Sequence, residues 1–470
     1  MIKQLVLNSS PIFWIVFHVL LGFSATVSPI PVILWFYFVG LSSLRYLLRS
    51  SSSPFVLIAV IAYLISFELL ARMAQTYPFI PYELGKYLLF AGIIWGIIKY
   101  KSFGNLGWVM LVCLIPSLLI DVSGQVMQSD IIFNVLGPIN VALVVIFFYR
   151  QKVSLKQWFH LARLIIYPIL GVLGYTFLKT PDFSEVEFEL STNVDLSGGF
   201  GSNQVSTLFG LGAFLIFILM INRYRLSGNF FMDAFLLFAF TFQGLLTFSR
   251  GGMLGGLLGV AIVLFFIRKP SQFEKKKFQL PQVGKYVLPT LLVAIGSYLV
   301  VDGLTGGLLT LRYQGETIGT LEGSKEKSIN SITTGRFEIF TGDLELWKEN
   351  PILGVGAGAS RFLRPTMTGT VAHVEVSRLL AEHGAFGLIY FFIICFLGFR
   401  LLRSNPNPMV RGIAVAFFTI AIYTTFHAAM RTYVTPILIG LSLLWIRNYS
   451  PKKKVEVKES TKEPSLLLKN

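Results

Sequence analysis

Apolar runs follow one another along almost the whole chain. Each run is about 17 to 25 residues long, the length that an α-helix needs to cross the hydrocarbon core of a membrane. In hydrocarbon every backbone N–H and C=O must be bonded within its own segment, so such runs are expected to be helical. The pattern therefore predicts an all-α polytopic membrane protein with about 12–14 transmembrane helices.

The expected spans share this apolar character and are separated by short polar breaks. They are 11–27, 30–47, 54–72, 82–98, 104–120, 131–148, 158–178, 203–221, 230–248, 251–267, 284–301, 378–401, 411–428 and 431–446. No internal repeat relates one set of spans to another, which argues against a transporter built from inverted repeats.

Two longer polar stretches interrupt the spans, an acidic one at 179–203 and a larger one at 302–377. The larger stretch contains a helix-like run at 334–349, predicted to be an amphipathic helix that lies on the membrane or the bundle. Its expected apolar face carries Phe337, Phe340, Leu344 and Trp347. The glycines of 354–358 follow this run and predict a flexible turn.

These boundaries predict five parts of the chain, in the order of the sequence. They are an N-terminal transmembrane bundle (1–178), further transmembrane helices (179–301), a large extracytoplasmic loop with short helices (302–377), C-terminal transmembrane helices (378–448) and a basic tail (449–470).

Charge adds an orientation to this picture. Only 14% of the residues are charged, and the net charge is +16. The basic residues cluster in alternate short loops, for example Arg45 and Arg49, Lys99 and Lys101, and 275–277. By the positive-inside rule these loops and both termini are cytoplasmic, so the two long polar stretches lie outside. Nucleic acid is not expected as a partner, because the positive charge belongs to loops between membrane spans.

Two arginines on the outer side are candidates for binding an anion. Arg250 lies between two spans and is followed by Gly251 and Gly252, so it can face an anionic group or simply reach lipid headgroups. Arg336 follows Gly335 at the start of the amphipathic run, where backbone donors and a guanidinium suit a phosphate. The alternative for Arg336 is a solvated surface charge.

A second group of candidates lies beside the last spans and around residue 200. His373 can accept a proton near neutral pH, although an interfacial histidine with a structural role is the commoner case. Arg378 and Glu382 have the spacing of a structural ion pair. The further candidates for this face are Glu375, Asn203, Arg72 and Arg431. Several arginines at one membrane face suit a diphosphate, and a lipid-linked diphosphate sugar is a membrane substrate that needs such a site.

Four stretches resemble the O-antigen ligase and polymerase superfamily of bacterial cell-envelope glycosyltransferases. They are 199–204 (GFGSNQ), 249–252 (SRGG), 334–347, and 350–358 (NPILGVGAG) taken with the segment that begins at His373. In the histidine segment Gly384 and Gly387 match the family pattern. Val374 departs from it, since the family has a polar residue there, and this makes Glu375 the reserve candidate for a base.

The resemblance implies transfer of a glycan from undecaprenyl diphosphate to an acceptor hydroxyl outside the bacterial cytoplasmic membrane. The acceptor is a lipid A core sugar in a ligase and a second lipid-linked glycan in a polymerase. No nucleotide sugar, cofactor or metal is expected. Arg250 and Arg336 would bind the diphosphate, His373 would be the general base, and Arg378, Arg431 and Arg72 would complete the anion site. Ligase and polymerase both remain open, and a lipid transporter or flippase and a scaffold are alternatives from other classes.

Overall fold

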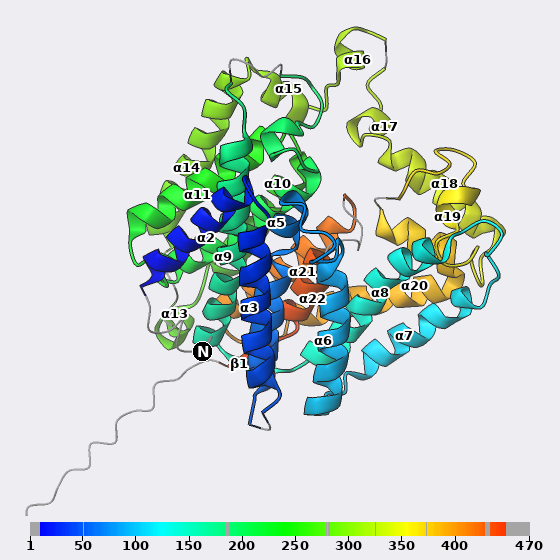
Figure 1. Ribbon diagram of the computed structural model, residues 1–470, viewed down its shortest axis with the longest axis horizontal. Helices are drawn as coiled ribbons and strands as arrows, with labels where there is room; N and C mark the ends of the chain where they lie inside the picture. Colours follow the sequence, from blue (N-terminus) through cyan, green and yellow to red (C-terminus); the bar gives the residue numbers. More distant parts are fainter. Residues whose placement is uncertain are drawn as a thin grey trace, which may run out of the picture.

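The computed structural model describes residues 10–49, 51–183, 188–278, 280, 283–324, 326–372, 374–427 and 433–447 (Figure 1). Helices make up nearly all of its regular structure, which confirms the predicted all-α class. The exceptions are two three-residue strands, β1 (Lys152–Ser154) and β2 (Trp445–Arg447), which pair in parallel.

The helices of the first half begin and end close to the expected spans. They are α2 (Pro11–Ala25), α3 (Ile30–Leu47), α4 (Pro54–Ile65), α5 (Glu68–Met73), α6 (Leu84–Tyr100), α7 (Asn105–Leu118), α8 (Gln128–Phe148) and α9 (Leu155–Lys179). Those of the second half are α10 (Ser202–Ile221), α11 (Phe230–Leu246), α12 (Arg250–Ile267), α13 (Gln272–Phe278), α14 (Val283–Leu304), α20 (Glu375–Leu401), α21 (Pro408–Thr424) and α22 (Val434–Ser442).

Among the residues that the structure describes, eight segments are long and apolar enough to cross a membrane, and four further apolar helices are shorter. This is a polytopic membrane architecture. Two expected spans are not among these twelve. They are 82–98, where α6 has 17 residues, and 431–446, where α22 has nine residues and the chain then enters β2. At about 1.5 Å per residue α22 covers less than half of a bilayer core. The number of spans remains a prediction.

Glycines let α10 and α12 approach each other closely. A Cβ added at Gly252 would lie 2.2 Å from the carbonyl carbon of Ser206, and one at Gly256 would lie 2.4 Å from the carbonyl oxygen of Gly210. The glycines that follow Arg250 therefore form a packing face, as expected for small residues in membrane helices. This contact fixes the start of α12, where Arg250 lies, against α10.

The large polar stretch folds into short helices at one end of the bundle. They are α15 (Leu308–Tyr313), α16 (Ile318–Leu321), α17 (Ile329–Ile332), α18 (Arg336–Glu349) and α19 (Ser360–Leu363). We call this the loop end. In Figure 1, α15 to α17 lie at the top, whereas α13 and β1 lie low in the view, at what we call the basic end because both carry lysines.

The helix predicted at 334–349 is present as α18 and packs on the bundle, but the face that it buries differs from the expected apolar face. Its buried residues are Ile339, Gly342, Asp343 and Leu346, and the helix packs on α20, whereas Phe337 is 44% exposed. A polar contact explains the difference. Asp343 accepts a hydrogen bond from Ser377 Oγ at 2.8 Å and pairs with Arg364 at 3.2 Å, which holds its face inward.

Backbone hydrogen bonds anchor the glycine-rich segment 354–358, which the sequence predicted to be a flexible turn. Helix α20 breaks at Gly384, whose φ is 56° and ψ is −134°. The break frees two carbonyl groups of α20, which accept hydrogen bonds from the backbone N–H groups of Val355 at 2.8 Å and Gly356 at 3.2 Å. The segment is thus tied to the kink as part of one unit.

Candidate functional site

A cavity of about 950 Å³ opens at the loop end, between the bundle and the short helices. The bundle contributes Asn203, Ser249 and Arg250 to its lining, and the large polar stretch contributes Arg312 and Arg336. The structure therefore brings together three of the residues predicted from the sequence, namely Arg250, Arg336 and Asn203. It adds Arg312, which was not predicted.

Arg250 is held at the first position of α12 by a short chain of polar contacts. Ser249 Oγ donates to Asn203 Oδ1 at 2.7 Å, and Ser206 Oγ donates to the Ser249 carbonyl at 2.7 Å. The Arg250 guanidinium donates to the carbonyl groups of Arg312 at 3.0 Å and Ile332 at 2.7 Å. It thereby links the bundle to the loop helices across the cavity.

Arg312 lies in α15 and donates from Nη1 to the Leu190 carbonyl at 2.8 Å. Burial lowers the pKa of its guanidinium to about 10, and the neighbouring positive charges of Arg250 and Arg336 act in the same direction. The arginine remains charged at neutral pH. The sequence marks Arg312 as a site residue only weakly. It is a single arginine in the otherwise apolar or hydroxylated run LLTLRY, with no glycine or motif beside it.

Arg336 is the first residue of α18, directly after Gly335 in a left-handed conformation. Its Nη1 donates to the Thr334 hydroxyl at 3.2 Å and more distantly to the Thr333 carbonyl. Burial lowers the pKa of this guanidinium, and the nearby charge of Arg250 lowers it further. A helix start and a guanidinium at one wall of a cavity suit an anion.

The three arginines lack carboxylate partners among the residues that the structure describes. Glu326 and Glu338 also line the cavity, and Glu338 accepts a hydrogen bond from Asn330 Nδ2 at 3.0 Å. Three like charges near one another repel, more so where water is partly excluded. An anion between them would relieve this repulsion.

His427 is a second lining residue that was not predicted. It follows the end of α21, and its Nε2 lies 3.1 Å from the Thr207 hydroxyl while Nδ1 lies 3.2 Å from the Tyr423 carbonyl. Its ring can position a polar group at this wall of the cavity.

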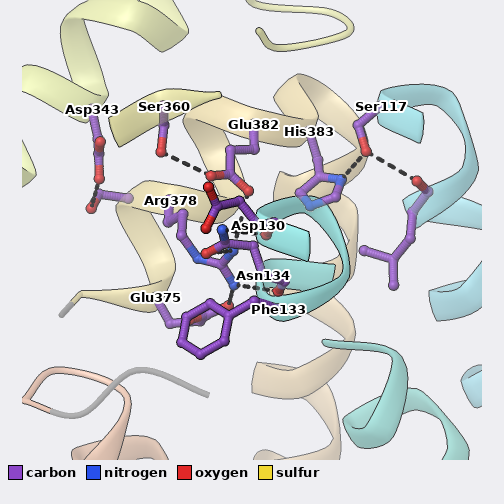
Figure 2. Close-up of polar contacts among 12 residues, drawn as sticks. Ser117, Asp130, Phe133, Asn134, Asp343, Ser360, Glu375, Arg378, Glu382 and His383 are labelled. Atoms are coloured by element: carbon purple, nitrogen blue, oxygen red, sulfur yellow. Dashed lines mark hydrogen bonds and ion pairs between the residues drawn. The ribbon is translucent and has the colours of Figure 1, made fainter. Parts of the chain in front are cut away.

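Arg378 and Glu375 do not line this cavity. Figure 2 shows Arg378 in a buried network, where it pairs with Glu375, with Glu382 at 3.1 Å and with the side chain and carbonyl of Asn134 at 3.1 Å. Both terminal nitrogens of the guanidinium are thus engaged by the protein. This geometry favours the structural ion pair over the predicted substrate contact, which remains untested.

Of the other predicted residues, one lies near the cavity and two lie in segments that the structure does not describe. Arg72 pairs with Glu68 and donates to Gln204 Oε1 at 3.2 Å, so it lies beside the start of α10 but outside the cavity lining. His373 and Arg431 lie outside the described residues. Their predicted roles remain predictions.

Residues 234–392 match the protein family described as O-antigen ligase. This similarity supports membership of the O-antigen ligase and polymerase superfamily. The match covers about a third of the chain and contains Arg250, Arg312 and Arg336 together with the anchored glycine segment. A search of curated proteins found no match. The superfamily supports a reaction of the O-antigen ligase or polymerase type in general.

Proposed function

We propose that the protein is an O-antigen ligase-type enzyme that moves a glycan from undecaprenyl diphosphate to a hydroxyl of a lipid A core sugar. The observation that carries the proposal is the convergence of Arg250, Arg312 and Arg336 on one cavity at the loop end. A diphosphate carries the charge and the oxygen atoms that three guanidinium groups can bind. The family match supports the class of reaction.

In the proposed reaction the acceptor oxygen attacks the anomeric carbon directly. The bond between that carbon and the phosphate oxygen breaks, and its electron pair leaves with undecaprenyl diphosphate. Arg250 and Arg336, with Arg312 beside them, stabilise the negative charge that develops on the diphosphate. Direct displacement inverts the configuration at the anomeric carbon.

A base has to take the proton of the acceptor hydroxyl, and the arginines cannot do so because they do not deprotonate. His373 is our candidate, since a histidine can accept a proton near neutral pH. Glu375 is less suitable than the sequence suggested. It is buried, and its carboxylate is engaged by Arg378.

The loop end would face the periplasm and the basic end the cytoplasm, following the distribution of lysine and arginine. A repeat-unit polymerase would use the same donor chemistry with a second lipid-linked glycan as acceptor. A transporter or flippase is the alternative from another class. It is less well supported because the three clustered arginines lie at one end of the bundle, whereas transporter sites lie near the bilayer midplane.

The test is to delete the gene and examine the surface glycans on a gel after complementation. Wild type, Arg250→Ala, Arg336→Ala and His373→Ala are compared, with Arg45→Ala at the basic end as a control. We expect each of the three alanine variants of the site to reduce glycan transfer at least about 100-fold. Arg250→Ala and Arg336→Ala each remove a contact that stabilises the transition state, and His373→Ala removes the proposed base.

The glycan pattern of the deletion strain separates the alternatives. Loss of all long glycan from the lipid A core, with lipid-linked polymer still present, indicates a ligase. A core that carries a single repeat unit indicates a polymerase. Wild-type glycan from all three site variants, each inserted in the membrane at normal level, would refute the proposed site and favour transport.

A further inference from the structure

Two adjoining cavities at the basic end form a separate feature of the molecule. The larger has a volume of about 510 Å³, and the smaller, of about 230 Å³, shares Tyr149, Leu397 and Arg400 with it. Their walls come from the start of α7, the end of α8, the last turns of α20, and the segment from α22 into β2. They are distinct from the cavity at the loop end.

Within the described residues, three arginines line these cavities and no acidic residue does. Arg150, Arg400 and Arg403 line the larger cavity, and none of them forms an ion pair within the described part of the chain. The guanidinium groups of Arg150 and Arg400 lie 5.2 Å and 5.6 Å from the ring centre of Tyr149. One aromatic ring therefore contacts two of the three cationic groups.

The floor of the larger cavity is built from well-connected backbone. The Arg150 N–H donates to the Leu443 carbonyl at 3.3 Å, and the Trp445 N–H donates to the Gln151 carbonyl at 2.8 Å. Beyond these residues β1 and β2 pair in parallel. Backbone hydrogen bonds therefore connect the segment that carries Arg150 to the segment that leads into β2, so Arg150 does not lie on an isolated loop.

Apolar side chains on the surface flank the arginines. Phe396 and Phe399 of α20 are 50% and 63% exposed, and Phe103 at the smaller cavity is 71% exposed. In a membrane protein such surfaces contact acyl chains. Arg400 and Arg403 lie at or just beyond the end of α20, where headgroups are expected to begin if this helix spans the membrane. Positive cavities between transmembrane helices beside an apolar surface are suited to lipids with an anionic head.

We propose that the cavities of Arg150, Arg400 and Arg403 bind the headgroup of an anionic glycerophospholipid. The guanidinium groups contact the phosphate, since arginine matches phosphate oxygens with two parallel donors. The acyl chains lie along Phe396 and Phe399. This site is independent of the proposed glycan transfer, because none of its residues lines the cavity at the loop end.

The test uses the full chain purified in detergent and titrated with phosphatidylglycerol or phosphatidylcholine. Thermal unfolding and native mass spectrometry report binding. The double variant Arg400→Gln/Arg403→Gln is compared with Arg268→Gln. Arg268 is a matched control, because it lies 4.1 Å over the ring of the exposed Phe265 on the same end but lines neither cavity.

We expect phosphatidylglycerol to raise the unfolding temperature and to remain bound, and phosphatidylcholine to do neither. The double variant should weaken phosphatidylglycerol binding about 30-fold, as expected for the loss of two basic residues near anionic lipid. The control should bind as the wild type does. If the double variant does not fold, Arg403→Gln alone is measured by mass spectrometry.

Three outcomes would overturn the proposal. The first is that the arginine variants bind phosphatidylglycerol as the wild type does. The second is that Arg268→Gln weakens this binding as much as the double variant does, which would mean diffuse electrostatic attraction. The third is that the wild type binds phosphatidylcholine as well as phosphatidylglycerol. Glycerol phosphate supplies a further arm. If it stabilises the protein as strongly as the lipid does, the ligand is a free phosphate and the lipid assignment is wrong.

Discussion

At the scale of single residues, the cavity at the loop end is organised by arginines that act on one another. Arg250 donates to the carbonyl of Arg312, and the charges of Arg250 and Arg336 both lower the pKa of Arg312. A cluster of cations without carboxylate partners costs free energy in a partly buried place. Such a cost is expected where the cations serve to bind an anion.

Replacing Arg312 tests whether this third arginine takes part. We expect Arg312→Ala to reduce glycan transfer roughly 100-fold, because one contact to the diphosphate is lost. Arg312→Lys should recover part of the activity, since it keeps the charge but not the paired donors. Transfer is measured as restored surface glycan in the deletion strain, normalised to the amount of membrane-inserted protein.

Lys327→Ala is the control for Arg312. Lys327 lies in the same polar stretch, is 44% exposed and pairs with Glu316, so its loss should leave transfer unchanged. Full activity of Arg312→Ala, or an equal loss in Lys327→Ala, would remove Arg312 from the proposed site.

At the scale of elements, the break in α20 and the anchored segment 354–358 act as one joint. Gly384 has a conformation that only glycine adopts readily, and a Cβ there would lie 2.5 Å from the Ile352 carbonyl oxygen. The matching glycine, Gly354, would place a Cβ 2.5 Å from the carbonyl carbon of Glu382. The glycines of this part of the family match therefore serve close packing of backbone on backbone.

The substitution Gly384→Ala should open this joint. We expect it to lower the free energy of unfolding by about 1–3 kcal/mol or more, from backbone strain and the steric overlap. Thermal unfolding of the purified protein measures the effect. Gly296→Ala in α14 is the control, since a Cβ there meets nothing within 4 Å. Equal stability of the two variants would show that the break does not need glycine.

At the scale of the whole molecule, two chemically different ends are separated by an apolar bundle. The loop end, with α15 to α17, and the basic end, with α13 and β1, lie apart in Figure 1. The cavity of the three arginines is at the loop end, and the cavities of Arg400 are at the basic end. Helix α10 runs through the interior, with nearly all of its residues buried. The two sites are thus held at opposite ends by one packed core.

Their sidedness can be tested with a reagent that does not cross membranes. A cysteine replacing the exposed Ser324 at the loop end should react with an impermeant maleimide in intact spheroplasts. A cysteine replacing the exposed Lys276 in α13 should react only after the membrane is opened. The unsubstituted chain, with Cys113 and Cys395, gives the background. Labelling of the Lys276→Cys variant alone in intact spheroplasts would reverse the proposed orientation.

The sequence by itself determined the class of the protein, because transfer of an apolar segment into hydrocarbon depends on that segment's own length and composition. It also singled out Arg250, Arg336 and Asn203, which lie beside glycine or helix-start signals and which the structure places at one cavity. The tertiary structure alone decided that Arg312 joins them, that Arg378 is paired within the protein, and that α18 faces inward with Asp343. These outcomes depend on contacts between distant segments, such as Arg312 with Leu190 and Arg378 with Asn134. Local sequence patterns do not encode which of those segments meet.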